Sequence, residues 1–217
     1  MKAAVRKIME EYPGKYPALE ACRADMYAAL ESLTACFASG GKLLVCGNGG
    51  SASDALHIVG ELMKGFVLPR RLEGKDKQRI AENCPDADYM LRNLQGALPA
   101  IALVSETALM TAYANDEAPD LCFAQQVWGY GREGDALLCI TTSGNSKNTL
   151  YAAEAARARG MRVIGLTGQS GGKLAPLSDI CIRVPAVRAH EVQELHLPVY
   201  HCLCLALEET FYGRGED

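Results

Sequence analysis

Lys42-Leu-Leu-Val-Cys46 is a largely apolar run that leads directly into the glycine-rich segment Gly47-Asn-Gly-Gly-Ser51. The run predicts a short buried strand, and the residues after Ser51, among them His57 and Glu61, predict a helix. Glycines let the backbone bend sharply and expose N–H groups, and Ser51 can cap the next helix, whose N-terminus carries positive partial charge. This geometry suits a phosphate, although a plain strand-to-helix turn without a ligand has the same pattern.

Four further β-rich runs follow along the chain, and segments with helical periodicity separate them. With the first run, the predicted strands cover residues 42–46, 100–104, 136–140, 162–166 and 180–184. Short buried strands joined by helical crossovers indicate a parallel sheet covered by helices on both faces. We therefore predict an α/β fold: a five-stranded parallel sheet in a flavodoxin-like, three-layer arrangement.

Polar, glycine-containing turns follow three of these strands: 47–51, Thr141-Thr-Ser-Gly-Asn-Ser146 and Thr167-Gly-Gln-Ser-Gly-Gly172. Each leads towards another helical segment. Ligands of parallel α/β sheets sit beyond the carboxyl ends of the strands, so these turns are expected to form one site. The hydroxyls of 141–146 favour a monophosphate, and because the Gly-Lys-Ser/Thr ending of a P-loop is missing, a nucleotide cofactor is not expected. Simple helix capping by Ser143 and Ser146 is the alternative.

The N-terminal part of the chain is predicted to be helical. Between Pro17 and Ser39 the apolar residues recur at spacings of three and four, at Leu19, Cys22, Met26, Leu30, Leu33 and Phe37. This stripe, closed by Gly40-Gly41, predicts one long amphipathic helix within an N-terminal helical region, residues 1–39.

Residues 68–99 interrupt the alternation of strands and helices with a long polar segment. A connection of this length usually carries a function or a small helix of its own, and Asp86 to Leu94 fits such a helix. Its basic residues are expected to form a solvated face rather than a phosphate clamp.

Bulk composition limits the classes of function. A chain of 217 residues, 49% of them hydrophobic, predicts a single domain spanning 1–217. No run approaches the roughly 20 apolar residues that cross a bilayer, and the N-terminal residues do not form a signal-peptide core, so a cytoplasmic location is expected. Nine scattered cysteines suggest small core side chains in a reducing compartment, and a net charge of −4 argues against nucleic-acid binding.

Two pairs of polar residues carry possible proton chemistry. His57 and Glu61 lie four residues apart on one helical face, and Gln193 and His201 lie on another predicted helix. A carboxylate and an imidazole can move protons near neutral pH, and the same four side chains could instead hold zinc. Because Gln193 and His201 would be about 12 Å apart along one helix, neighbouring subunits would help to complete a zinc site. We expect His190 and His196 to be ordinary structural residues.

Four motifs together resemble one family: 46–51, Ile140–Ser146, Leu166–Lys173 and Val192–His201. Their order and sequence resemble the SIS (sugar isomerase) fold, specifically the phosphoheptose isomerases, over nearly the whole chain from Pro17 to Phe211. The resemblance implies isomerisation of sedoheptulose 7-phosphate to D-glycero-D-manno-heptose 7-phosphate through an enediol, with Glu61 and His201 as the general acid/base pair.

The same resemblance implies roles for further residues. The phosphate would be held by Gly49, Ser51, Thr141, Thr142, Ser143 and Ser146. Contacts to sugar hydroxyls or to the reacting carbon would come from Asn48, Asp116 and Gln193. Because some members of the family bind zinc at positions matching His57, Glu61, Gln193 and His201, zinc is a candidate cofactor. The family also implies a homotetramer whose N-terminal helices form the central bundle.

Two departures from the family pattern are visible. Thr141 stands where a serine is usual, which keeps the hydroxyl, and residues 68–99 replace a short loop, an insertion of roughly 32 residues. A non-catalytic branch of the fold, which binds the bacterial replication initiator, resembles the chain around 109–116. That branch lacks the carboxylate and imidazole that Glu61 and His201 provide, which favours an enzyme over a phosphosugar sensor or regulator.

Overall fold

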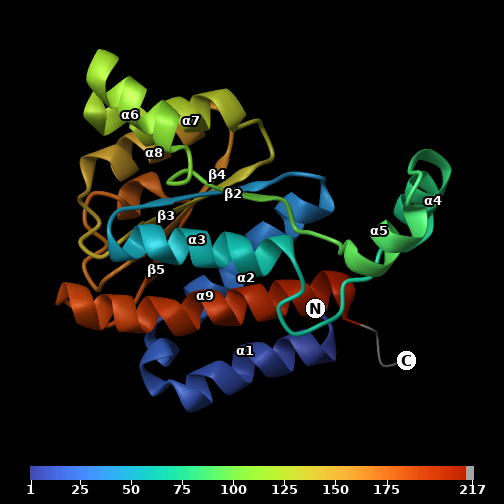
Figure 1. Ribbon diagram of the computed structural model, residues 1–217. Coiled ribbons are helices and arrows are strands. Elements are labelled where there is room, and N and C mark those ends of the chain that lie inside the picture. The colour runs from blue at the N-terminus through green and yellow to red at the C-terminus, as the bar shows by residue number, and fades with distance from the viewer. Residues whose placement is uncertain (214–217) are drawn as a thin grey trace.

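A computed structural model describes residues 1–213 and contains a five-stranded parallel sheet, as predicted (Figure 1). The strands are β1 (Leu43–Gly47), β2 (Ala100–Ala102), β3 (Ala136–Thr141), β4 (Arg162–Thr167) and β5 (Ile180–Arg183). Their order in the sheet is β2-β1-β3-β4-β5, and every pairing is parallel. This is the flavodoxin-like order, in which the chain reverses its direction of winding between β1 and β3.

The strands are apolar because both faces of the sheet are covered. All residues of β1 and β3 are buried, and Leu43 pairs with Ala136 at the start of their register. Alternate residues enter two separate cores: Val45 packs into one, and Leu44 into the other. These strands therefore need continuous apolar runs. In a sheet with one solvent-exposed face, apolar and polar residues would alternate along each strand.

Helices form a layer on each face of the sheet (Figure 1). One layer contains α2 (Arg23–Ala38), α3 (Gly50–Met63) and α9 (Ala189–Tyr212), with α1 (Ala3–Lys15) packed outside α9. The opposite layer contains α7 (Cys122–Tyr130) and α8 (Lys147–Ala158), with α6 (Thr107–Asp116) beside them. The predicted three-layer arrangement is thus confirmed.

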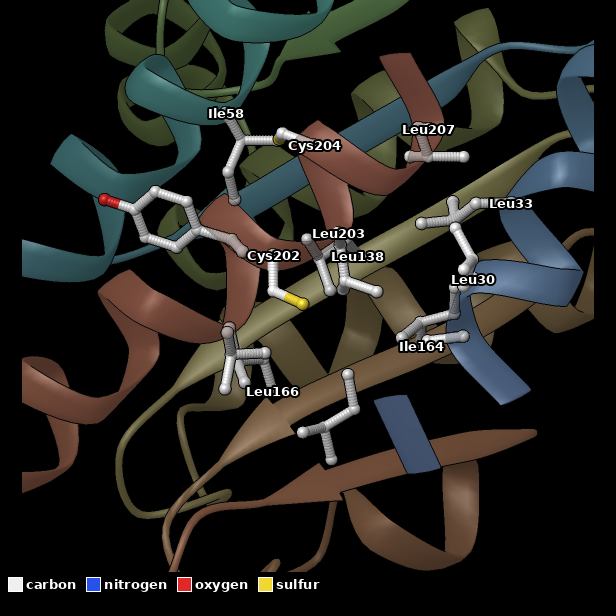
Figure 2. Packing of buried hydrophobic residues seen from close by; sticks show 14 of the residues in the cluster. Leu30, Leu33, Ile58, Leu138, Ile164, Leu166, Cys202, Leu203, Cys204 and Leu207 are labelled. Atoms are coloured by element: carbon white, nitrogen blue, oxygen red, sulfur yellow. The ribbon is translucent and has the colours of Figure 1, made fainter. Parts of the chain in front are cut away.

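Figure 2 shows the larger core, where α2, α3 and α9 meet the sheet. Leu30 and Leu33 of α2, Ile58 of α3 and Leu203 of α9 lie over strand residues such as Leu138. Cys202 and Cys204 belong to the same cluster and are fully buried. The cysteines are all free, and seven of the nine are buried, as expected for small core side chains.

The N-terminal prediction was right in type but wrong in detail. Residues Pro17–Cys22 form a 3-10 helix, and the α-helix begins only at Arg23. Apolar residues three apart, such as Leu19 and Cys22, lie on one face of either kind of helix, so the spacing does not distinguish them. Gly40, at φ +80°, ends α2 as predicted, because its left-handed backbone lets Gly41 donate back to Cys36.

Residues 68–99 contain a helical pair, α4 (Gly74–Asn83) and α5 (Ala87–Asn93), which projects from the body of the molecule (Figure 1). The second helix was predicted, whereas the first was not. No residue of either helix is buried. A bridge between Arg71 and Gln95 closes the base of the segment. That the segment is an insertion into the family pattern stays a prediction.

Three smaller predictions need correction. The helical segment after the turn that follows β4 is a short 3-10 helix, Ala175–Leu177, and not an α-helix. Gly49 is the N-cap of α3, and Ser51 lies inside the helix. Ser146 is the N-cap of α8, but its hydroxyl makes no capping bond. None of the described helices has the length and apolarity that a bilayer crossing requires.

Candidate active site

Helices α3 and α9 bring His57, Glu61 and His201 into one region, and Gln193, earlier in α9, reaches Gly50 at the start of α3. His57 Nε2 lies 3.2 Å from Glu61 Oε1, as expected for two side chains one helical turn apart. The ring of His201, from α9, stands edge-on to the His57 ring with 5.0 Å between centroids. Glu61 and His201 are 140 residues apart in the sequence, and the packing of α3 on α9 places both beside His57.

Two residues that the sequence analysis missed extend this group. The hydroxyl of Tyr200 donates to Asp54 Oδ1 at 3.2 Å and lies 3.0 Å from His57 Nδ1. The result is a chain of contacts from Asp54 through Tyr200 and His57 to Glu61. We call these four residues and His201 the acid–base half of the site. Asp54 could have been found, because it shares the helical face of His57 and Glu61 at spacings of three and seven.

Several buried polar atoms of the acid–base half have no hydrogen-bond partner within residues 1–213. They are Asp54 Oδ2, Glu61 Oε2 and His201 Nε2. Buried polar atoms are almost always paired, so unpaired ones in a cluster indicate a place where a ligand, an ion or water binds. Lys64 Nζ stands 3.7 Å from Glu61 Oε2, too far for a hydrogen bond.

Burial tunes the acidity of these groups. The pKa of His201 is lowered by desolvation and by the neighbouring His57, and Glu61 opposes this only in part. A neutral imidazole, able to accept a proton, is the consequence. Desolvation raises the pKa of Asp54, while the hydrogen bond from Tyr200 counteracts it. Desolvation and the Asp54 carboxylate raise the pKa of Tyr200, which keeps its hydroxyl protonated.

A buried ion pair fixes the end of α3 that carries Glu61. The guanidinium of Arg70 donates to the carbonyl oxygens of Glu61 and Leu62 at 2.9 and 2.6 Å, which satisfies two of the free carbonyls at a helix C-terminus. Its Nε donates to Glu208 Oε1 of α9 at 2.8 Å, and both side chains are completely buried. Arg70 thus ties α3 to α9.

Glu208 also fixes the loop that follows α3. Its carboxylate accepts from the backbone N–H groups of residues 66, 67 and 68 at 2.7 to 3.0 Å. Burial alone would raise the pKa of Glu208, but these donors and Arg70 outweigh it and lower the pKa. The loop positions Phe66, whose ring lies 5.5 Å from the ring of His201. Arg70 and Glu208 were not predicted, because their 138-residue separation leaves no pattern in the sequence.

The other half of the site, called the phosphate half after its predicted ligand, consists of the turns 47–51, 141–146 and 167–172, which the strand order places at one edge of the sheet. In the first turn, Gly49 has φ +57°. A Cβ on Gly50 would lie 2.5 Å from Nε2 of Gln193, so a larger residue there would displace the Gln193 side chain. Gln193 therefore reaches this turn, while Ser51 beside it is buried.

The second and third turns touch each other through glycines. Gly144 has φ +69°, and a Cβ there would overlap the carbonyl oxygen of Gly171. A cavity of about 390 Å³ opens between these turns. It is lined by Thr142, Ser143, Asn145, Gly168, Gln169, Ser170, Ala186 and Val187. Hydroxyl, amide and glycine backbone groups around a hollow of this size suit a phosphorylated small molecule.

Hydrogen bonds define the shape of the second turn. The hydroxyls of Thr141 and Ser146 lie 3.1 Å apart, and Ser143 Oγ accepts from the N–H of Asn145 at 3.2 Å. Asn48, from the first turn, exchanges two 2.9 Å amide hydrogen bonds with Asn148 at the start of α8. This reciprocal pair links the first turn to the second.

Three sequence-predicted positions fall elsewhere or in unexpected surroundings. Asp116 lies exposed at the end of α6, where its carboxylate accepts from Asn115, and no described contact joins it to the other site residues. His190 is exposed. His196 was expected to be an ordinary satisfied residue, but it is completely buried and neither ring nitrogen meets hydrogen-bond geometry with any described residue. Burial lowers its pKa to about 4, although the nearby Thr167 backbone opposes the shift.

The donor types at the centre of the site fit zinc. Two imidazoles, one carboxylate and the Gln193 amide are available, and the unpaired Glu61 Oε2 and His201 Nε2 are atoms that a cation would satisfy. Residues 1–213 contain no ready group of three or more His, Cys, Asp or Glu side chains in a metal-binding arrangement. Both ring nitrogens of His57 contact protein groups, Tyr200 and Glu61.

Comparisons of the sequence and of the structure with known proteins point to the same family. Residues 92–168 match the model of the SIS domain. The chain is 41% identical to the phosphoheptose isomerase of Rhodospirillum rubrum, with 87% of each chain covered. Among solved structures it resembles a phosphoheptose isomerase from Francisella tularensis, with a TM-score of 0.74, 34% identity and coverage of 95% of this chain and 99% of that one. The phosphoheptose isomerase from Neisseria gonorrhoeae gives a TM-score of 0.72 at 33% identity, covering 95% and 96%.

Proposed function

Because the chain belongs to the phosphoheptose isomerase family, we propose that it interconverts sedoheptulose 7-phosphate and D-glycero-D-manno-heptose 7-phosphate through an enediol. The observation that carries the proposal is that Glu61 and His201 both lie against His57, each with an unpaired buried polar atom. Helix α9 extends from this pair to the phosphate half, since Gln193 lies against Gly50. One substrate can therefore be anchored at its phosphate and react at its other end.

In this mechanism the substrate phosphate binds to the turn 141–146, to Ser51 and to the backbone around Gly49. Its binding energy holds carbons 1 and 2 against α3 and α9. Glu61 moves the carbon-bound proton between these two carbons, and His201, kept neutral by burial, moves the proton between the two oxygens. Asn48 and Gln193 contact the sugar hydroxyls. Asp116 would join them only through a rearrangement or from a neighbouring subunit.

We further propose that zinc is bound by His57, Glu61, Gln193 and His201. When bound, zinc would polarise the substrate carbonyl. The 3.2 Å between His57 Nε2 and Glu61 Oε1 is close to the separation of two ligand atoms on one tetrahedral zinc ion. The protein residues still perform the proton transfers and hold the phosphate.

A cytoplasmic homotetramer is the proposed working form. The free cysteines suit a reducing compartment. The N-terminal helices α1 and α2 are the proposed contact elements of the tetramer, and sedimentation analysis of the purified protein would measure the oligomeric state.

The decisive test is incubation with sedoheptulose 7-phosphate in D2O, followed by NMR. Wild type is expected to form product and to lose the proton signal at carbon 1. Glu61→Gln should lose roughly 10²- to 10⁴-fold in turnover yet still bind the sugar phosphate. The matched control is Glu194→Gln, which neutralises an exposed carboxylate on α9 and should keep full activity. Binding without turnover in wild type, with zinc supplied, would support a phosphosugar sensor instead.

A further inference from the structure

The contact chain Asp54–Tyr200–His57–Glu61 contains a limited number of protons. A tyrosine hydroxyl has one proton, and the Tyr200 hydroxyl donates it to Asp54 Oδ1 at 3.2 Å. Its oxygen is then left to accept a hydrogen bond. The group 3.0 Å away is His57 Nδ1, and the arrangement that satisfies this oxygen has Nδ1 carry a proton and donate it to Tyr200.

The position of this proton fixes the other side of the imidazole. A neutral imidazole holds one N–H, so Nε2 of His57 carries a lone pair. This lone pair faces Glu61 Oε1 at 3.2 Å. Two acceptors at that distance repel each other unless a positive group lies between them or next to them, so the arrangement is prepared for a proton or a zinc ion.

We infer that Tyr200, held by Asp54, is a positioning residue that fixes His57 as the Nδ1–H tautomer and turns its Nε2 lone pair towards Glu61. The packing agrees with this role, because the Tyr200 ring stands edge-on to His57 with centroids 5.4 Å apart and is itself almost completely buried. Its hydroxyl is thereby held in place. Only the consequence for catalysis depends on the proposed function.

The tautomer can be measured directly in the metal-free, full-length protein. With ¹⁵N-labelled histidine at a pH where imidazole is neutral, NMR separates ring nitrogens that carry a proton from those that carry a lone pair. His57→Asn assigns the His57 signals among the four histidines. Wild type should show the proton on Nδ1. A wild-type signal with the proton on Nε2 would overturn the inference.

Two variants change different members of the chain. Tyr200→Phe keeps the ring packing but removes the acceptor at Nδ1, which leaves Glu61 Oε1 as the acceptor beside the ring, so the proton should move to Nε2. Asp54→Ala removes the acceptor of the Tyr200 hydroxyl, which is then free to donate to Nδ1, so the proton should move to Nε2. An unchanged His57 spectrum in both folded variants would overturn the inference.

Zinc titration gives a second, independent measurement. Loss of a group that orients a metal-binding histidine typically weakens metal affinity 10- to 100-fold, and Tyr200→Phe should do so in competition with a chelator. Tyr12→Phe is the matched control, since Tyr12 also packs against the large core but lies outside the chain of contacts. Equal zinc affinity in both variants would contradict the inference. If zinc binding and the tautomer behave as expected but wild type shows no turnover, the proposed function fails while the role of Tyr200 stands.

Discussion

Side chains shape the acid–base half of the site, whereas backbone shapes the phosphate half. Around His57 and Glu61, the geometry depends on hydrogen bonds between side chains and on the Arg70–Glu208 ion pair behind them. In the turns after β1, β3 and β4, it depends on glycines that let backbone segments touch. The first half should therefore respond to loss of a charge or hydroxyl, and the second to the gain of a single methyl group.

The largest loss of stability is expected from breaking the buried Arg70–Glu208 ion pair behind the acid–base half. Glu208→Gln leaves the guanidinium of Arg70 buried without its counter-charge, which typically costs about 3 to 5 kcal/mol of unfolding free energy. Urea unfolding measures this loss. Asp76→Asn is the control, because it removes one partner of an exposed ion pair and should cost less than about 1 kcal/mol. Similar losses for the two variants would show that Arg70 is not held by Glu208.

His196, on α9 between the two halves, predicts a pH dependence of stability. Its pKa is about 4 in the folded protein and 6.5 when unperturbed, so below pH 6.5 the unfolded chain binds more protons. Its contribution is complete above pH 6.5 and decreases by about 3 kcal/mol as the pH falls to 4. Urea unfolding of His196→Phe at pH 7.5 and 4.5 should lack this part of the loss. His190→Gln, an exposed control, should keep it, and a wild-type slope in His196→Phe would contradict the assignment.

A single methyl group tests the phosphate half. Gly144→Ala adds a Cβ where φ is +69° and where the oxygen of Gly171 already lies, so the two turns must separate. The backbone conformation alone costs about 1 to 2 kcal/mol. Gly40→Ala is the matched control, since φ is +80° there but no atom lies within 4 Å of the added Cβ. Gly144→Ala should lose more stability than the control and also weaken phosphosugar binding; equal losses and unchanged binding would mean that the contact between the turns is dispensable.

The smallest effect is expected for one hydroxyl of the same half. Ser143→Ala removes a hydrogen-bond donor that lines the cavity, which should raise the Michaelis constant roughly tenfold with little change in turnover number. Steady-state kinetics measure both. Ser53→Ala, on the exposed face of α3, should leave both constants unchanged. If Ser143→Ala behaves like this control, the phosphate is bound elsewhere.

The same contrast explains what could be predicted from the sequence. The strands and the glycine turns follow local patterns, since a buried parallel strand is a short apolar run and the turn after it needs glycine. His57 and Glu61 share a helical face within five residues, so their contact also follows from local spacing. The fold and the glycine turns after the strands were therefore visible in the sequence.

Contacts between distant elements were not visible in this way. Tyr200 meets Asp54 only because α9 crosses α3, and the pairing of Arg70 with Glu208 depends on the path of the loop after α3. The burial of His196 depends on which side of α9 faces the sheet, and this cannot be read from one isolated polar residue in an apolar stretch. The boundary between the 3-10 helix and α2 was likewise hidden, because both helices accept the same apolar spacing.

The helical pair α4–α5 leaves from and returns to one narrow base, where Arg71 bridges to Gln95 and Gly96 donates to the carbonyl of Arg70. Neither helix contributes a buried residue, so the fold of a single chain places few demands on the sequence of residues 74–93. Selection for stability alone would let these positions drift in composition and length while the base stays fixed. A sequence constraint on residues 74–93 would therefore have to come from contacts outside the core of the chain. Slow substitution at these positions among relatives would indicate such contacts.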